Sequence, residues 1–509
     1  MNGKAEAMAP LTGFRLILAG AVLALTNFMV VLDTTIANVS VPHIAGSLGI
    51  SASQGTWIIT SYAVAEAVCV PLTGWLAGRF GTVRTFTFGM IGFGVFSVLC
   101  GMSTTLGMLV ACRIGQGLCG GPLMPLSQTL LMRIFKPEQR AQAMGVWAMT
   151  TVVAPILGPI LGGTISDSWS WHWIFFINIP VAAICAFGAM HLLRSVETPT
   201  EKLRVDRIGL MLMLLWIAAL QILLDLGREH DWFNDPLIVS LGVIAAIGFA
   251  VFLAWEVTEG EPIVDLRVFR HRGFTVAVTS LSFAFATFFA SAVIIPQWLQ
   301  TSMGYTATYA GYATAFTGVA AVIMSPIVAK LSTKVDPRAL VCFGILWLGM
   351  TSLLRVHWSS QADFWTLAFP QLLQGVGMPF FFIPLTTLAL GAVEPHETAS
   401  AAGVMSFMRT MAGAIGTSIS ATMWDDGARV ARSEIVSRLN TQGTVDAMTA
   451  QGFSLDQIRS VMAQLVDKEA FALATNHIFL ISAFIFAGAA MIIWLTPRPT
   501  RAVAMGAAH

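Results

Sequence analysis

The sequence predicts an all-α membrane protein that crosses the bilayer many times, and two observations lead to this prediction. Apolar residues make up 56% of the 509 residues, and charged residues make up only 11%. A soluble domain carries about 25% charged residues, so this composition cannot build a water-covered surface. The apolar residues also fall in blocks of about 20, which is the length that crosses a roughly 30 Å hydrocarbon core as a helix.

These blocks predict fourteen transmembrane helices. They cover residues 16–39, 55–77, 85–104, 107–130, 142–164, 172–193, 208–226, 237–257, 274–298, 309–331, 338–356, 365–389, 400–422 and 472–495. Lysine and arginine gather in the even-numbered connections, and neither occurs in the odd-numbered connections 39–54, 165–171, 299–308 and 357–364. Because positively charged loops stay in the cytoplasm, this bias predicts that both termini are cytoplasmic.

The last odd-numbered connection, 423–471, is the exception to this charge pattern. It carries five lysines and arginines against seven aspartates and glutamates. A segment of this length crosses a membrane largely regardless of its charge, so it says little about orientation. The sequence predicts a long, mixed-charge external segment here.

An internal repeat divides the chain into two halves. Three short matches recur at offsets between 255 and 259: Pro71 with Pro326, Gln116-Gly117 with Gln374-Gly375, and Pro125-Leu126 with Pro384-Leu385. The repeat predicts a six-helix bundle in residues 1–200, two extra helices in 201–272 and a second six-helix bundle in 273–509. Two parallel halves are typical of transporters that rock about a site near the middle of the membrane.

Ionisable residues inside spans are costly and usually mark functional sites, and three stand out in the first half. Asp33 and Arg113 each lie about seven residues, or roughly 10 Å, inside the outer ends of their helices, so they share a depth. Glu66 lies near the centre of the second helix. We interpret Asp33 and Glu66 as proton-exchanging groups and Arg113 as their coupling partner. For Glu66 a second role stays open, direct binding of a cationic substrate. The alternative is a static ion pair of Asp33 with Arg113 that only holds helices together.

Small residues recur on one face of the fifth predicted helix. Ala154, Gly158 and Gly162 lie four residues apart, which permits close approach of a neighbouring helix. Pro155 and Pro159 each remove a backbone donor and so bend or loosen the helix. The pattern favours a moving or sealing element, and the alternative is ordinary tight packing.

No other site chemistry is indicated. The six cysteines lie in apolar blocks without zinc or redox spacing, and no glycine-rich loop ends in the Lys-Ser/Thr pair of a phosphate-binding loop. We expect no catalytic residue, no metal and no cofactor, so an ion gradient rather than ATP would drive transport. The net charge of +1 gives no reason to expect nucleic acid as a partner.

The chain resembles the major facilitator superfamily, and within it the fourteen-span drug:proton antiporters of the EmrB/QacA type, most of all the EmrB branch. The resemblance covers nearly the whole chain. It rests on Leu32–Val39, on Gln54–Trp57, on a gating motif with Gly74, Arg79, Gly81 and Arg84, on a proton-coupling motif with Arg113, Gln116 and Gly117, on an antiporter motif with Ala154, Pro155, Gly158, Pro159, Gly162 and Gly163, and on Trp171–Pro180.

Two departures from the family pattern stand out. The gating motif commonly has an acidic residue where this chain has Gly78, so any latch here would rest on Arg79, Arg84 and backbone contacts. In the second half, Gln371 stands where the repeat would place the counterpart of Arg113. This asymmetry suggests that proton coupling belongs to the first half and substrate contacts mostly to the second.

The resemblance implies a multidrug efflux pump that exports small amphipathic compounds in exchange for protons, located in a bacterial inner membrane. It also implies two partners, a periplasmic membrane-fusion adaptor of the EmrA type and an outer-membrane channel of the TolC type. Segment 423–471 is then either an adaptor contact or a solvated loop. The candidate cavity residues are Asn38, Gln116, Gln128 and Arg409, of which Arg409 is either a second functional cation or a packing residue.

Two other functions stay open from the sequence. The first is a dedicated exporter of one metabolite or of a fatty acid, and the second is a membrane sensor or scaffold that binds compounds without moving them. An enzyme is not expected, because no nucleophile, metal or paired-acid constellation occurs in the sequence.

Overall fold

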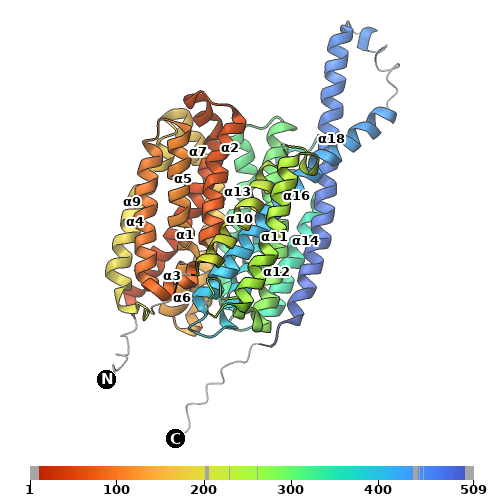
Figure 1. The fold of residues 1–509 in the computed structure, drawn as a ribbon. Helices are drawn as coiled ribbons and strands as arrows, with labels where there is room; N and C mark the ends of the chain where they lie inside the picture. The colour runs from red at the N-terminus through yellow and green to blue at the C-terminus, as the bar shows by residue number, and fades with distance from the viewer. Residues whose placement is uncertain are drawn as a thin grey trace, which may run out of the picture.

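The computed structural model describes residues 11–498, apart from 201–203, 205, 229, 261, 439–444, 446–447 and 451. All regular structure in these residues is helical, and they contain no strand, as the composition predicts. Figure 1 shows the long helices packed side by side, with the start of α1 and the end of α18 at the same end of the bundle. We call this end the termini side, and the opposite end, from which a helical hairpin projects, the hairpin side.

The first half contains the helices that follow the first six predicted spans. They are α1 Gly13–Leu48, α2 Ala52–Cys69, α3 Thr73–Phe80, α4 Thr82–Gly101, α5 Leu106–Gly120, α6 Leu123–Ile134, α7 Pro137–Ser168, α8 Trp173–Phe176 and α9 Asn178–Gly188. After α9 the chain tightens into a π-helical turn at Ala189–Leu193 and a 3-10 turn at Arg194–Val196.

Two predicted helices of this half are broken rather than continuous. The predicted helix 55–77 divides into α2 and α3, with a bend of 59° between Gln54–Cys69 and Thr73–Phe80. The predicted helix 107–130 divides into α5 and α6. Pro71 and Pro122 lie in the two breaks, and neither residue can donate the backbone hydrogen bond that a continuous helix requires.

The extra helices and the second half follow the remaining predicted spans. They are α10 Arg207–Leu226, α11 Pro236–Thr258, α12 Arg272–Thr301, α13 Ala307–Leu331, α14 Pro337–Arg355, α15 Phe364–Gly391, α16 Thr398–Arg438 and α18 Leu455–Ile492. Aspartate side chains cap the N-termini of α10, α11, α14 and α15 by accepting backbone N–H groups. These caps explain why the four helices begin where they do.

Each of the fourteen predicted stretches is therefore helical. Within the described residues, ten helices are long and apolar enough to cross a membrane, or twelve if each of the two bent pairs is one span. The two other stretches are the broken α5 and α6, each too short alone, and α16. The membrane fold is as predicted, and a count of fourteen spans is consistent with these helices.

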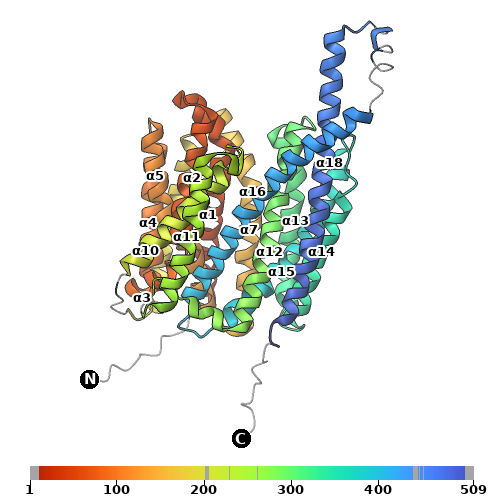
Figure 2. The same cartoon turned by 45° about the vertical axis from the view of Figure 1, so that its right-hand side comes forward.

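The predicted ends of the last two helices are wrong, because α16 and α18 continue far into segment 423–471. Figures 1 and 2 show both helices projecting from the hairpin side. Ser454 starts α18 with a capping box in which its side chain accepts the Gln457 N–H. The charged residues of this segment are solvated faces of helices beyond the bundle, which a search for apolar blocks does not detect.

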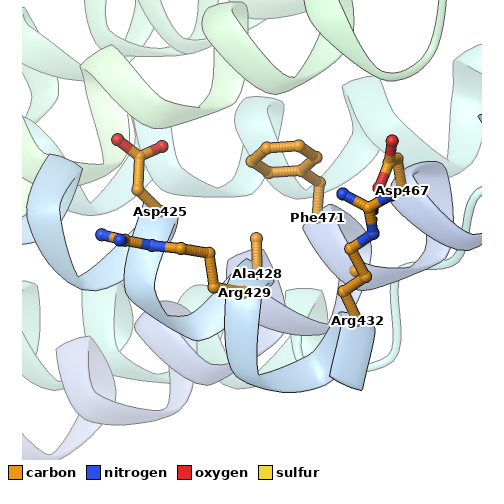
Figure 3. A pocket seen from close by; sticks show the side chains of 7 residues that line it. Asp425, Ala428, Arg429, Arg432, Asp467 and Phe471 are labelled. Atoms are coloured by element: carbon orange, nitrogen blue, oxygen red, sulfur yellow. Dashed lines mark ion pairs between the residues drawn. The ribbon is translucent and has the colours of Figure 1, made fainter. Parts of the chain in front are cut away.

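A cavity of about 360 Å³ lies at the base of this hairpin. Figure 3 shows its charged lining, Asp425, Arg429, Arg432 and Asp467, together with the Phe471 ring. Arg432 Nε lies 3.2 Å from Asp467 Oδ1, so an ion pair joins α16 to α18 here. None of the predicted site residues lines this cavity.

The two halves are in close contact at the termini side. A Cβ atom on Gly74 of α3 would lie 2.1 Å from Ser400 Oγ of α16, and one on Gly403 would lie 3.2 Å from Thr73 Cβ. The extra helices reinforce this seam, because α10 packs against both α2 and α16. The small residues of the gating motif therefore allow α3 and α16 to meet backbone to backbone.

Candidate ion-coupling site

A buried ion pair lies at the centre of the first half. Arg113 Nη1 on α5 donates to Asp33 Oδ2 on α1 at 2.7 Å, and both side chains are 1% exposed. The structure thus brings together the two residues that the sequence places at one depth. A charge-assisted hydrogen bond of this length between buried groups is among the stronger polar contacts in proteins.

Two amides complete the coordination of the Asp33 carboxylate. Gln116 Nε2 donates to Asp33 Oδ1 at 3.0 Å, and Asn178 Nδ2 of α9 donates to the same oxygen at 2.6 Å. Both amides also donate to Ser97 Oγ on α4, at 3.4 and 3.1 Å. The carboxylate only accepts hydrogen bonds in this network, so the network fits the ionised form of Asp33.

The Arg113 guanidinium is held on its remaining sides. Its Nε donates to the Ile58 carbonyl of α2 at 3.2 Å, and its Nη1 also donates to Gln116 Oε1 at 2.8 Å. The Tyr62 ring lies under the guanidinium with its centroid 4.1 Å away. Through these contacts and those of the two amides, the pair connects α1, α2, α4, α5 and α9. A change in the charge of Asp33 would therefore alter hydrogen bonds that hold five helices together.

Sequence reasoning missed Ser97 and Asn178 as members of this network. Both residues are buried polar groups in otherwise apolar helices, at 0% and 1% exposure. A buried amide in a span is a signal in itself, since it must find partners. Asn178 lies within the stretch Trp171–Pro180 that carries the family resemblance, but nothing in the sequence indicates that it points at Asp33.

Glu66 does not join this network. It is half-buried on α2, and among the described residues it has no hydrogen bond or ion pair. Its helix, α2, packs against both α5 and α16. Glu66 is therefore a carboxylate on a helix that contacts both halves, and it is free to bind a proton or a cation.

The other predicted cavity residues separate into different environments. Gln116 belongs to the Asp33 network, whereas Asn38 is exposed and lies outside it. Gln128 is 0% exposed, and neither atom of its amide group has a partner in the described part of the chain. Arg409 is 6% exposed and lies at the interface of the halves.

The antiporter motif forms the contact between α7 and α1. A Cβ on Gly158 would lie 2.2 Å from Thr35 Oγ1, and one on Gly162 would lie 3.1 Å from the Ile36 carbonyl oxygen. Gly163 has nothing within 4 Å of such a Cβ, so it faces away. The close approach of α7 to α1, the helix that carries Asp33, therefore depends on Gly158 and Gly162 and not on Gly163.

The same helix is bent near the two prolines of the motif. The bend is 43° between Pro137–Pro155 and Ile160–Ser166. Pro155 is half-buried, while the side chain of Pro159 lies outside the described part of the structure. The close packing and the bend together place a deformable helix directly beside the ion pair.

The gating loop is anchored by a residue that sequence reasoning missed, Glu197. Its two carboxylate oxygens accept the N–H groups of Val83 and Arg84, each at 2.9 Å, at the start of α4. Gly81 has a φ of +92°, and a Cβ there would lie 2.6 Å from Glu197 Oε1. Glycine at this position is needed for both the backbone conformation and the approach of the carboxylate.

The two arginines of the gating motif act differently from each other. The Arg79 guanidinium lies 5.6 Å from the Trp75 ring centroid and 5.8 Å from that of Phe80. The Arg84 side chain is exposed, and its contribution to the loop is its backbone N–H. The carboxylate that Gly78 cannot supply comes to this loop from Glu197 instead, about 120 residues along the chain.

The second half carries a buried cation that the repeat does not indicate. Arg355 of α14 is 0% exposed, and its Nη2 donates to Gln371 Oε1 at 2.9 Å and to Gln374 Oε1 at 2.5 Å. Gln371, at the position that corresponds to Arg113, thus accepts a hydrogen bond from a buried cation instead of supplying one. The cation comes from a different helix than in the first half, and the network has no carboxylate corresponding to Asp33.

No group of three or more His, Cys, Asp or Glu side chains within the described residues is placed to hold a metal ion. The cysteines described by the structure are free thiols. The chemistry of the site is therefore that of carboxylates, guanidinium groups and amides.

Comparison with known proteins identifies the family. The sequence pattern of the Major Facilitator Superfamily matches residues 23–417. Two bacterial relatives match over 96% of the chain: Multidrug export protein EmrB of Escherichia coli K12, 42% identical over 97% of its length, and Fatty acid resistance protein FarB of Neisseria gonorrhoeae, 41% identical over 98%.

A solved structure supports the same assignment at the level of the fold. The human organic anion transporter MFSD10 covers 92% of this chain and 99% of its own, with a TM-score of 0.57 and 15% sequence identity. The matched family consists of transporters rather than enzymes. The chain therefore belongs to the major facilitator superfamily and is an EmrB-type transporter.

Proposed function

We propose that this transporter exports amphipathic compounds in exchange for protons, with Asp33 as the coupling carboxylate. The observation that carries the proposal is the buried network in which Asp33 accepts hydrogen bonds from Arg113, Gln116 and Asn178. A carboxylate that is buried, ionised and shared by several helices changes the balance among those helices when it binds a proton.

The proposed cycle follows from the donors and acceptors of this network. Proton binding to Asp33 removes the negative charge that holds Arg113, and a protonated oxygen must itself find an acceptor. Arg113 is then a buried cation without its carboxylate, which costs several kcal/mol unless the helices rearrange. Proton release restores the network seen here. Binding of substrate and of a proton in opposite conformations would couple the two movements, with the proton gradient as the energy source.

The location of the contacts between the halves supports alternating access. The halves meet at the termini side through Gly74 and Ser400. We infer that the termini side faces the cytoplasm of a bacterial cell, because the lysine- and arginine-rich connections lie there. In this orientation the structure corresponds to a conformation closed toward the cytoplasm.

We further propose that the hairpin of α16 and α18 binds a periplasmic adaptor, which would connect the transporter to an outer-membrane channel. The hairpin projects from the side opposite the termini, as Figure 2 shows, and presents charges of both signs around the cavity at its base. A projecting charged hairpin is suited to a protein contact in water. Adaptor binding that is unchanged when residues 430–466 are replaced by a short linker would contradict this assignment.

A second candidate function is export of one class of compound, such as fatty acids. It is favoured by the relative whose name describes fatty acid resistance, which is nearly as similar to this chain as the multidrug export protein. A panel of cationic, neutral and anionic amphiphiles would separate a broad exporter from a narrow one. A sensor or scaffold would bind compounds from this panel without moving them.

The experiment that tests proton coupling is efflux of ethidium from proteoliposomes under an imposed pH gradient. We expect wild type to move the dye against its gradient and to stop when an ionophore collapses the pH difference. Asp33→Asn should abolish this movement, whereas Glu138→Gln, which changes an exposed side chain in the first turn of α7, should not affect efflux. Gradient-independent movement by wild type, or full activity of Asp33→Asn, would contradict the proposal.

A further inference from the structure

A second buried guanidinium lies between the two halves. Arg409 of α16 lies about 11 residues from the start of its helix, or roughly 16 Å, which is near the middle of a 30 Å hydrocarbon core. Its side chain contacts the Met124 sulfur and the faces of two rings, Trp147 at 5.8 Å and Phe285 at 5.6 Å. Met124 and Trp147 belong to the first half, so Arg409 reaches across the interface.

The partners of Arg409 differ in kind from those of Arg113. Among the residues that the structure describes, no carboxylate lies within ion-pair distance of Arg409 and no oxygen accepts a hydrogen bond from it. A thioether sulfur is a weak acceptor, and ring faces contribute only about 0.5–2 kcal/mol each. Arg409 is therefore a buried cation without an anionic partner in the described part of the chain. Burial of an unpaired charge costs several kcal/mol.

An acidic residue of the other half lies nearby, Glu66 of α2. A Cβ on Gly121, three residues before Met124, would lie 3.0 Å from the Glu66 carbonyl oxygen. Glu66 and Arg409 do not form an ion pair in the described part of the chain. In the described part of the chain, the Glu66 side chain accepts no hydrogen bond and Arg409 donates none to an oxygen. Each half thus contributes one charged side chain without an ion-pair partner.

The surroundings of Arg409 suit the hydrocarbon part of an amphiphile. Trp147 of α7 stacks on Phe382 of α15 with ring centroids 6.0 Å apart and an angle of 14° between the rings. Phe285 lies 5.3 Å from the same Phe382 ring. The adjacent cavity holds only about 10 Å³, which is room for one water molecule. A larger ligand would therefore enter when the two halves, and with them Trp147 and Phe382, separate.

We propose that Arg409 binds the acid head group of anionic amphiphiles, with Trp147, Phe285 and Phe382 around their hydrocarbon part. The class of ligand is a monoanion with an apolar body, such as a medium-chain carboxylate. A carboxylate would give Arg409 the paired oxygen acceptors that it lacks in this structure. Glu66 then opposes anions and attracts cations from the facing half, so the two residues together set which head group binds. This assignment rests on the proposed export function.

Direct binding tests the assignment without a proton gradient. Purified full-length protein in nanodiscs is titrated with radiolabelled decanoate and with decyltrimethylammonium, which has the same chain length and the opposite charge. We expect Arg409→Met to weaken decanoate binding at least tenfold and to leave decyltrimethylammonium binding unchanged or stronger. Arg409→Lys should retain part of the decanoate affinity. Arg272→Met, which changes an exposed arginine at the start of α12, is the matched control and should affect neither compound.

Glu66→Gln provides a second test that does not depend on how Arg409→Met folds. It should strengthen decanoate binding and weaken decyltrimethylammonium binding severalfold, because it removes the negative charge that faces Arg409. Equal weakening of both compounds by Arg409→Met, unchanged decanoate binding, or no decanoate binding by wild type would each overturn the assignment. Any of these results in a protein that still pumps ethidium would leave the proposed export function standing.

Discussion

Asp33 Oδ2 and Arg113 Nη1 lie 2.7 Å apart on two different helices, in a part of the molecule where neither side chain is more than 1% exposed. Removal of one of the two charges would leave the other charge buried without a partner, which is costly. Removal of both charges together should cost less, and the difference in the free energy of unfolding can be measured.

Arg113→Met should lower the free energy of unfolding by about 3–5 kcal/mol, because it leaves the Asp33 carboxylate buried without its cation. The double variant Asp33→Leu with Arg113→Met should recover most of this loss, since it removes both charges together. Thermal unfolding of the purified variants measures the effect. Additive losses in the double variant would show that the two side chains do not depend on each other.

Gly158→Ala should impair both stability and transport. The new methyl group would meet Thr35 Oγ1 at 2.2 Å, so α1 and α7 would have to move apart, at a cost of about 1–3 kcal/mol. Gly163→Ala is the matched control, because it adds the same methyl group where nothing lies within 4 Å. Efflux and unfolding temperatures of the two variants are compared. Equal effects would contradict the close packing of Gly158 on Thr35.

Glu197→Ala should loosen the start of α4. The substitution removes the acceptor of the Val83 and Arg84 N–H groups and should cost about 0.5–2 kcal/mol, as for the loss of a helix cap. Glu138→Ala, which removes an exposed acid from the first turn of α7, is the control. Hydrogen exchange of the amides at the start of α4 measures the loss. Unchanged protection there would show that Glu197 is not the anchor.

A charged cluster on the termini side predicts acid sensitivity. Glu397 accepts hydrogen bonds from Arg270 Nη2 and from the Glu394 N–H, and its other contact is His271 Nε2 at 2.8 Å. Burial acts to raise the pKa of Glu397, but the hydrogen bonds and the positive charges outweigh it and hold the pKa below the usual 4.5. A lowered pKa stabilises the fold above the usual value, and the stabilisation is lost as the pH falls through the lowered pKa.

Glu397→Gln should therefore reduce stability by about 1–3 kcal/mol at pH 7, and the difference from wild type should shrink below pH 4.5. Unfolding temperatures of both proteins between pH 7.5 and pH 3.5 measure this dependence. His396→Gln, a change to a neighbouring exposed residue, serves as the control. A difference that stays constant over the whole range would show that ionised Glu397 contributes nothing.

Much of the fold could be predicted from the sequence, because apolar blocks of span length leave a chain few alternatives in a membrane. The depth of Asp33 and Arg113 could be predicted in the same way, from counting residues along two helices. The breaks at Pro71 and Pro122 were open to prediction, since proline lacks the backbone donor. The helical hairpin was not, because its helices lie in water and carry charge instead of apolar blocks.

The rest of the site depends on distances that no local pattern contains. Asn178 reaches Asp33 only because α9 packs beside α1, and Ser97 reaches the amides of Gln116 and Asn178 only because α4 packs against α5 and α9. Glu197 reaches Gly81 only because the chain returns there after α9. The cation Arg355 likewise comes from a helix that the repeat does not single out. Sequence patterns locate costly polar residues in spans, but packing decides which of them meet.

The central claim is that Asp33 exchanges its proton when substrate binds, and proton release measures this most directly. Ethidium is added to the purified protein in weakly buffered detergent solution with a pH-sensitive dye. We predict that wild type releases protons on binding and that Asp33→Asn binds ethidium without releasing them, while Glu66→Gln shows whether the second carboxylate takes part. Equal proton release by wild type and Asp33→Asn would contradict the account.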